Sequence, residues 1–139
     1  MARFILLLSL TFNLWFALPA AAQQAKCPAK FDEFLQRFET DMRFQVAHVR
    51  FPLPISFLDE DGRIKDRLSK LQYTKPRQPW YPTPEMQAQW EVRKSVRDVS
   101  KTRKIVHFEQ QDVEAYWVDF HFQKSGPCWR LVFMDDRSS

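Results

Sequence analysis

The chain has 139 residues, which is enough for one domain with a single hydrophobic core and too few for two. Its formal net charge of +4 is mild, and this argues against a dedicated nucleic-acid binder, which usually carries a concentrated basic stripe. The 2 glycines, Gly62 and Gly126, are too few and too isolated for a phosphate-cradling loop, a dinucleotide fingerprint or a nucleophile elbow.

The N-terminal segment has the pattern of a secretory signal peptide. One positive charge precedes an apolar run, and Ala20 and Ala22 fit the small-residue rule for cleavage after Ala22. A membrane anchor is the alternative, but the run of about 15 residues is shorter than the roughly 20 needed to cross a bilayer. We expect a signal peptide over 1–22 and a single α+β domain over 23–139, with no membrane span after cleavage and a periplasmic or secreted location.

Two cysteines lie near the ends of the predicted mature domain, Cys27 and Cys128. In an oxidising compartment an even number of cysteines usually pairs, so we expect one Cys27–Cys128 disulfide. Two buried thiols are the alternative. Neither cysteine has a second cysteine or a histidine at ligand spacing along the chain, and we therefore predict no metal site and no cofactor.

Residues 29–40 read AKFDEFLQRFET, with apolar residues at positions 31, 34, 35 and 38. This spacing is typical of an amphipathic helix, and its aromatic stripe predicts packing against a sheet. Asp41 is a good N-cap residue and predicts a second short helix directly after the first.

The stretch RFPLPISF, residues 50–57, alternates apolar residues but contains Pro52 and Pro54. Because each proline removes a donor of the strand ladder, we expect an edge strand or an extended arm here. The sequence DEDG at 59–62 is a turn signal. Residues 85–104 are ambiguous, since their apolar positions fit both a strand and a helix.

A proline-rich segment, KPRQPWYPTP at 75–84, carries Trp80 and Tyr81. One interpretation is that Trp80 folds back as a lid on the core. The other is a recognition loop, because loops carry binding residues more often than their share of the chain.

The strongest local charge asymmetry follows this segment, and it is either a solvated face or a contact for an acidic partner. It consists of Arg93, Lys94, Arg97, Lys101, Arg103 and Lys104. An aromatic anchor beside arginines is the commonest composition of an interface hot spot. We therefore predict a binding surface made of Trp80, Tyr81, Arg93, Arg97 and Arg103.

The last third of the chain contains three β-rich runs, KIVHF, VEAYWVDFHFQ and CWRLVFM, separated by turn sequences. Tyr116, Val118, Phe120 and Phe122 share one face of the middle run, and Trp129, Leu131 and Phe133 share one face of the last. Placing these faces on one side predicts an antiparallel sheet with an aromatic inner surface.

The other face of the middle run shows Asp119 and His121. If the hairpin at EQQD is tight, Arg103 lies opposite Asp119 and Lys101 opposite His121, and such a solvated Asp–Arg pair contributes ~0.2 to 1 kcal/mol. The catalytic alternative has Asp119 orient His121 as a general base, but the two lie roughly 6 to 7 Å apart along the strand. We therefore predict a charged outer face and no catalytic residue.

A metal site is a second alternative for this face. His107 and Glu109 offer ligands that could join Asp119 and His121. The predicted register separates the two pairs along the sheet, so we do not expect this site.

The motifs FDEFLQRF, FQVAHVRFPLP and CWRLVFMDD give the chain a resemblance to a known class. It resembles secreted bacterial domains of unknown function within the nuclear-transport-factor-like, cystatin-like α+β class, over about residues 27–136. The resemblance implies a curved antiparallel sheet wrapped round the N-terminal helix, a cystatin-like cone with a pocket. Such folds host enzymes, ligand binders and interaction modules alike, so no catalytic residue is transferred.

Three functions remain open. The first, which we expect, is an exported non-catalytic interaction or ligand-binding protein, such as an inhibitor or immunity-type partner, that binds another envelope protein or a small ligand. The second is a small isomerase or hydrolase that uses Asp119 and His121 inside the cone. The third is a binder of anionic envelope polymers through the basic cluster.

Overall fold

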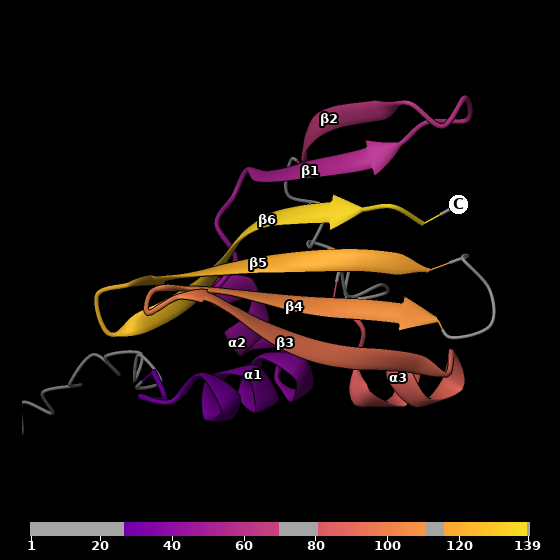
Figure 1. Cartoon of the computed structure of the whole chain (residues 1–139). Coiled ribbons are helices and arrows are strands. Elements are labelled where there is room, and N and C mark those ends of the chain that lie inside the picture. Colours follow the sequence, from indigo (N-terminus) through magenta and orange to yellow (C-terminus); the bar gives the residue numbers. More distant parts are fainter. Residues whose placement is uncertain (1–26, 70–80, 111–115, 139) are drawn as a thin grey trace, which may run out of the picture.

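The structure is a computed structural model that describes residues 27–69, 81–110 and 116–138. Within these ranges, three helices lie on one face of a six-stranded sheet (Figure 1). The helices are α1 (Phe31–Thr40), α2 (Met42–Ala47) and α3 (Pro84–Gln89). The strands are β1 (Leu53–Leu58), β2 (Ile64–Ser69), β3 (Val92–Ser100), β4 (Arg103–Gln110), β5 (Trp117–Ser125) and β6 (Cys128–Asp136).

The strand order is β2-β1-β6-β5-β4-β3, so β2 and β3 form the edges. Neighbouring strands are antiparallel except β1 and β6, which are parallel. The sheet is curved and does not close into a barrel, and the helices cover its inner face (Figure 1). This is the α+β architecture with an N-terminal amphipathic helix that the sequence predicted.

Helix α1 packs its aromatic stripe onto the inner face, as predicted. Phe34 and Phe38 are fully buried. The ring of Phe38 lies 5.2 Å from that of Phe122 on β5, and the ring of Phe31 lies 4.9 Å from that of Trp129 on β6. Edge-to-face contacts of this kind contribute ~0.5–1.5 kcal/mol beyond the area they bury. Helix α1 is thereby held against β6.

The predicted N-cap of α2 is confirmed. The Asp41 carboxylate accepts hydrogen bonds from the backbone N–H groups of Arg43 and Phe44, at 3.0 and 3.1 Å. The ambiguous segment after residue 84 divides into α3 and β3. Thr83 caps α3 by accepting from the N–H of Met86, and the left-handed backbone of Glu91 then turns the chain into β3.

Strand β5 has the inner face that its alternation predicts, with Val118, Phe120 and Phe122 buried. The prediction for β6 is wrong at one position. A register shift beside His121 and Phe122 pairs His121 with Phe133 and Phe120 with Met134. Because a β-bulge adds one residue to a strand, Phe133 turns to the outer face and Met134 takes the inner position.

Strand β1 is not an edge strand, contrary to the prediction. It lies between β2 and β6. Its pairing with β6 begins only at Ile55, one residue after Pro54. The missing N–H of Pro54 therefore falls before the shared ladder and interrupts no bond to β6.

The Cys27–Cys128 disulfide is present and joins the segment before α1 to the start of β6, with a Cα–Cα distance of 5.4 Å. The predicted signal peptide over 1–22 lies outside the described residues. Among the helices that are described, none combines the length and apolar character needed to cross a bilayer.

Candidate functional site

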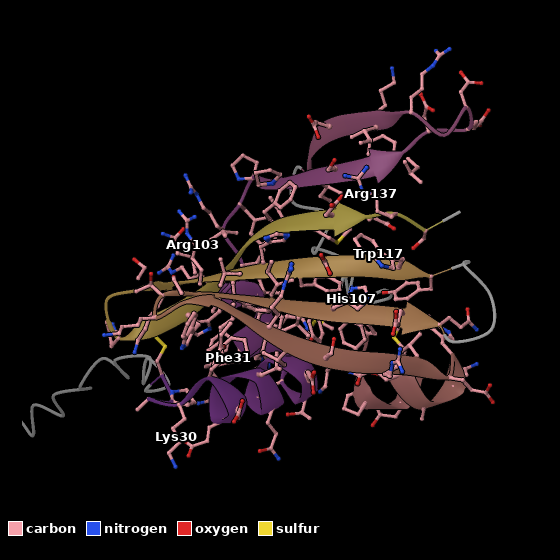
Figure 2. The ribbon with its side chains drawn as sticks, viewed as in Figure 1. Lys30, Phe31, Arg103, His107, Trp117 and Arg137 are labelled. Atoms are coloured by element: carbon pink, nitrogen blue, oxygen red, sulfur yellow. A yellow bond between two sulfur atoms is a disulfide. The ribbon has the colours of Figure 1, made fainter. Side chains whose placement is uncertain are left out.

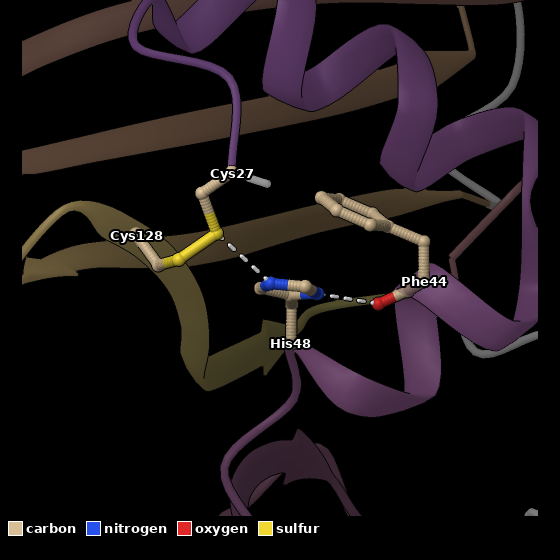
Figure 3. The surroundings of a disulfide bond; sticks show 4 residues. All are labelled: Cys27, Phe44, His48 and Cys128. Carbon is tan, nitrogen blue, oxygen red and sulfur yellow. Dashed lines mark hydrogen bonds between the residues drawn. A yellow bond between two sulfur atoms is a disulfide. The ribbon is translucent and has the colours of Figure 1, made fainter. Parts of the chain in front are cut away.

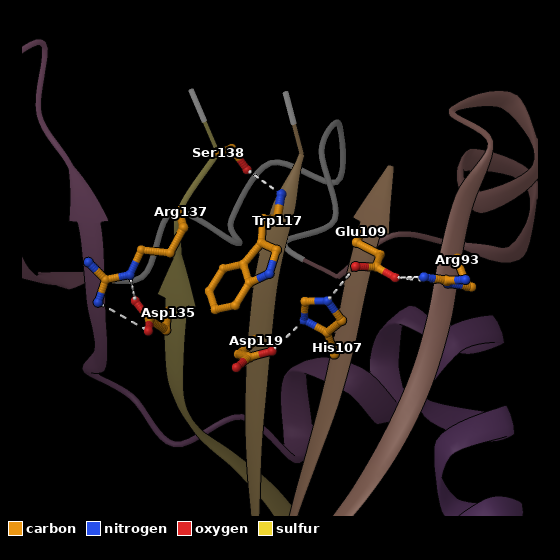
Figure 4. Close-up of polar contacts among 8 residues, drawn as sticks. All are labelled: Arg93, His107, Glu109, Trp117, Asp119, Asp135, Arg137 and Ser138. Carbon is orange, nitrogen blue, oxygen red and sulfur yellow. Dashed lines mark hydrogen bonds and ion pairs between the residues drawn. The ribbon is translucent and has the colours of Figure 1, made fainter. Parts of the chain in front are cut away.

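The outer face of the sheet, opposite the helices, carries a polar network around His107 (Figures 2 and 4). His107 on β4 pairs in register with Asp119 on β5, and its Nδ1 lies 2.7 Å from the carboxylate. Arg103 instead lies opposite Gln123, so the predicted Arg103–Asp119 pair is wrong. The reason is the connection from Gln110 to Trp117, which is longer than the tight hairpin on which that register depended.

The network continues to the edge of the sheet. His107 Nε2 lies 3.4 Å from Glu109, and Glu109 in turn binds Arg93 on β3. Hydrogen bonds from Arg93 and His107 lower the pKa of the Glu109 carboxyl. The result is a ladder of polar contacts across β5, β4 and β3, in which each ring nitrogen of His107 faces a carboxylate.

This ladder is a poor acid–base site. A general base needs a ring nitrogen within hydrogen-bond reach of a substrate proton. Both ring nitrogens of His107 already have carboxylate partners, Asp119 and Glu109. Arg93 neutralises the charge of Glu109. His107, Glu109 and Asp119 do come together, which the predicted register excluded, but as a set of side chains that contact one another. A cross-strand charge pair of this kind stabilises a sheet without any further chemistry.

The candidate catalytic residues Asp119 and His121 both lie on this outer face. Asp119 is only 9% exposed, so its surroundings are not the solvated face that the sequence predicted. The ring of His121 packs edge-on against Phe133 at 5.0 Å. Burial lowers the pKa of His121, and Arg97 acts in the same direction, while Asp119 and Asp135 oppose them.

The predicted binding surface is divided by the sheet. Trp80 lies outside the described residues. Tyr81 is fully buried on the inner side, with its ring 4.7 Å from that of Phe120, so it is not the exposed aromatic that was predicted. Arg93, Arg97 and Arg103 are exposed, and Arg93 is committed to Glu109.

Tyr81 is buried because its polar end finds a partner. Its hydroxyl donates to the buried carboxylate of Glu39 at 2.9 Å, and Lys94 Nζ donates to the same group at 2.7 and 2.9 Å. Burial raises the pKa of Tyr81 well above its usual range, and the charge of Glu39 adds to this. Lys94, a member of the predicted basic cluster, therefore ties β3 to α1.

A cavity of about 180 Å³ lies between α3 and the inner face of the sheet. Its polar side-chain groups include one carboxylate and one phenol hydroxyl among apolar and aromatic side chains. It is lined by Pro82, Met86, Trp90, Tyr116, Val118, Phe120, Met134 and Asp136. Asp136 ends β6 two residues after Met134, so it continues the inner-face alternation of that strand. An acidic residue at an inward position was the one sequence signal that could have located this cavity.

The polar groups of the cavity are close together. Burial raises the pKa of the Tyr116 hydroxyl, and the charge of Asp136 raises it further, so the phenol keeps its proton at neutral pH. The ring of Tyr116 lies 5.5 Å from that of Trp90. The cavity thus presents one carboxylate, one phenol and two aromatic rings to an occupant.

A second hollow, of about 450 Å³, is rich in positive charge. It is lined by Arg50, Gln123, Lys124, Ser125, Arg130 and Val132. Arg103 lies opposite Gln123 on the neighbouring strand, and Arg97 and Arg103 form no ion pair within the described residues. We call the hollow lined by these six residues, without Arg97 and Arg103, the basic groove.

No family model matches the sequence, and no curated protein matches it. Among solved structures, the chain is similar to an NTF2-like protein from Bacteroides fragilis, with 21% identity and a TM-score of 0.58 over 78% of this chain and 47% of that one. The chain thus spans about half the length of that protein. An NTF2-like protein of unknown function from Shewanella baltica is 11% identical, with a TM-score of 0.46 over 81% of this chain and 98% of that one. The chain has an NTF2-like α+β fold, which confirms the expected class.

Proposed function

We propose that this chain is an exported, non-catalytic binding protein that holds a small, largely apolar ligand with a positively charged group in the cavity beneath α3. The observation that carries the proposal is the single carboxylate, Asp136, in an otherwise apolar and aromatic lining. Ligand sites are typically of this kind, with an apolar wall for affinity and a few polar groups that fix orientation.

The size and charge of the cavity restrict its ligand. A volume of about 180 Å³ is below the ~300–1,000 Å³ of sites for drug-sized molecules, so the ligand is small. Asp136 attracts a cation and repels an anion. The rings of Trp90 and Tyr116 favour a cation too, because an ammonium group over an aromatic face gains ~0.5–2 kcal/mol.

The chemistry of the lining supports binding rather than turnover. Its titratable side chains are Tyr116 and Asp136. Since the pKa of Tyr116 is raised, its phenol can donate a hydrogen bond at neutral pH but cannot accept a proton. The His107 ladder lies on the opposite face of the sheet and does not line this cavity.

Export is supported by two features. The N-terminal segment has the signal-peptide pattern, with cleavage expected after Ala22. The Cys27–Cys128 disulfide is the kind of crosslink that persists in an oxidising compartment and is rare in the cytosol.

Calorimetry on residues 23–139 tests the ligand class. Benzylammonium, benzyl alcohol and benzoate share one ring and differ in charge, and we expect binding to weaken in that order. Asp136→Asn should weaken benzylammonium binding by about 10-fold or more, because each ~1.4 kcal/mol of lost attraction is tenfold in affinity.

Asp135→Asn is the matched control, because Asp135 is adjacent but pairs with Arg137 on the outer face. It should leave benzylammonium binding unchanged. Equal binding of benzoate and benzylammonium, or an Asp136→Asn protein that binds as tightly as the wild type, contradicts the proposal.

The basic groove favours a second function, contact with an anionic envelope polymer. Arg50, Lys124 and Arg130 line it without an acidic residue. Binding to heparin resin should be lost in the Lys124→Glu, Arg130→Glu double variant and retained in Lys30→Glu, which changes an exposed cation at the start of α1. Elution that follows net charge alone, whichever lysine or arginine is changed, argues against a specific groove.

A further inference from the structure

A cluster of three potential metal ligands lies at the disulfide, which precedes α1 (Figure 3). Cys27, Cys128 and His48 each offer one ligand atom, and the three atoms lie within 4.8 Å of one another. Each of these residues is half-buried, so solvent can reach them. We propose that reduction of the Cys27–Cys128 disulfide converts this cluster into a binding site for Zn²⁺.

The spacing of the ligand atoms suits a tetrahedral ion. Zn–S bonds of about 2.3 Å and Zn–N bonds of about 2.0–2.1 Å place two sulfurs about 3.8 Å apart and a sulfur and a nitrogen about 3.6 Å apart. His48 Nε2 is already 3.1 Å from Cys27 Sγ. Once the S–S bond is broken, small side-chain rotations bring all three atoms to these separations.

The tautomer of His48 is the one that a metal needs. Its Nδ1 lies 2.7 Å from the backbone carbonyl of Phe44, which can only accept, so Nδ1 carries the proton. The lone pair is then on Nε2, which is directed at Cys27 (Figure 3). Metal-binding histidines usually donate their other ring N–H to a carbonyl or carboxylate in this way. The ring is also stacked on that of Phe44, at 3.9 Å between centroids.

The three ligands are held close together by contacts that do not depend on the disulfide. The backbone N–H of Leu131 on β6 donates to the carbonyl of His48 at 2.9 Å, and this fixes His48 beside the strand that starts at Cys128. On the other side, Phe31 of α1 packs on Trp129, the residue after Cys128. Reduction therefore leaves Cys27 and Cys128 near His48.

The exchange is balanced in atoms and charge. A dithiol reductant gives two electrons and two protons to the disulfide, closes to its own disulfide and leaves two thiols on the protein. Zn²⁺ then displaces the two thiol protons and binds two thiolates and the neutral imidazole, while water fills the fourth position. Thiolate and imidazole are ligands that suit Zn²⁺ better than the oxygen-preferring ions Mg²⁺ and Ca²⁺.

The test compares metal binding by the oxidised and the reduced protein. After reduction with a phosphine and anaerobic removal of the reagent, zinc chloride is titrated against a chromophoric zinc indicator. We expect one Zn²⁺ per reduced chain, release of two protons, and affinity at least about 100-fold above that of the oxidised protein, since the thiolates supply two of the three ligands. Cobalt(II) chloride should give a thiolate-to-metal charge-transfer band in the reduced protein alone.

Variants separate the three-ligand site from ordinary thiol chemistry. His48→Gln should weaken zinc binding by about 10-fold or more, which is the least that loss of a direct ligand is expected to cost. Cys27→Ser should weaken the charge-transfer band, because the Cys128 thiolate alone remains. His121→Gln changes a histidine on the outer face of β5 and should bind zinc as the wild type does.

Three results would overturn the inference. They are a reduced protein that binds no zinc, an oxidised protein that binds it equally well, and a His48→Gln protein with undiminished affinity. If reduction alone unfolds the chain, zinc should restore the near-ultraviolet circular dichroism of the reduced wild type but not that of reduced His48→Gln. Failure of zinc to do so also counts against the site.

Discussion

The two faces of the sheet are made from alternating residues of the same strands, but they bury very different groups. On β5, Phe120 is 0% exposed on the inner face and its neighbour Asp119 is 9% exposed on the outer one. Burial of Phe120 removes apolar surface from water, which stabilises the fold. Burial of Asp119 removes water from a charged carboxylate, and the hydrogen bond with His107 offsets that loss. Similar burial therefore does not mean a similar contribution to stability.

The largest expected effect is on the inner face. Phe120→Ala should lower the free energy of unfolding by ~3–5 kcal/mol, because it leaves a cavity between the rings of Tyr81 and Phe108. Phe133→Ala, which removes a half-buried ring from the outer face, should cost only ~1–2 kcal/mol. Urea unfolding of both proteins measures the difference, and equal losses would show that the inner face is not the tighter of the two.

The next effect is on the outer face. Asp119→Ala should cost ~1.5–3 kcal/mol, because it leaves His107 without the partner of a charge-assisted hydrogen bond. Asp119→Asn should cost less, since an amide oxygen can still accept from the Nδ1–H of His107. A double-mutant cycle with His107→Gln isolates the pair. Additive losses in that cycle would mean that Asp119 and His107 are not coupled.

A smaller effect is expected where α1 meets the inner face. Tyr81→Phe should cost ~1.5 kcal/mol, the low end for a hydrogen bond to a charged group, because the bond to the Glu39 carboxylate is lost while Lys94 still pairs with it. The folded pKa of Tyr81 is raised, so its contribution is complete below the unfolded value of about 10 and is lost as the pH rises towards the folded value. Unfolding followed from about pH 9 to 12 should show an alkaline loss that Tyr81→Phe reduces; an unchanged profile would assign the loss to other groups.

The smallest effect is expected at His121. His121→Gln should change stability by less than ~0.5 kcal/mol at pH 8, where the imidazole is neutral in both states. Because burial lowers the folded pKa, the unfolded chain binds a proton first as the pH falls below about 6.5, and stability declines on the acid side. Thermal melts between about pH 5 and 8 should show a weaker decline in His121→Gln. A steeper acid loss of stability in His121→Gln than in the wild type would contradict a lowered pKa of His121.

Features that depend on short-range periodicity were predicted correctly. The stripe of α1, the Asp41 cap and the inner face of β5 are each decided by residues within a few positions of one another. The disulfide was predicted from the number of cysteines and the expected compartment. None of these needs knowledge of which segments meet across the sheet.

Features that depend on loop length or distant partners were not predicted. The register of β4 and β5 depends on how many residues the connecting loop uses, and an error there replaced His107 by Arg103 as the partner of Asp119. Tyr81 was read as an exposed loop residue because its partner, Glu39, belongs to a helix far away in the sequence. The cavity beneath α3 was not located, because α3 was not separated from β3 in the sequence and the inward position of Asp136 was not used.

The central place of β6 has a consequence for the order of folding. Strands β3, β4 and β5 follow one another and can pair as each is formed, whereas β1 must wait for β6, because Ile55 pairs with Met134. Contacts between such distant segments form slowly, since a long loop must close before they are made. During that delay β1 and β2 form a two-stranded hairpin, which is marginal alone, and the edge of β6 that later pairs with β1 is open to another chain. Pairing of this edge with another chain, before β1 docks on β6, is therefore a hazard while the protein folds.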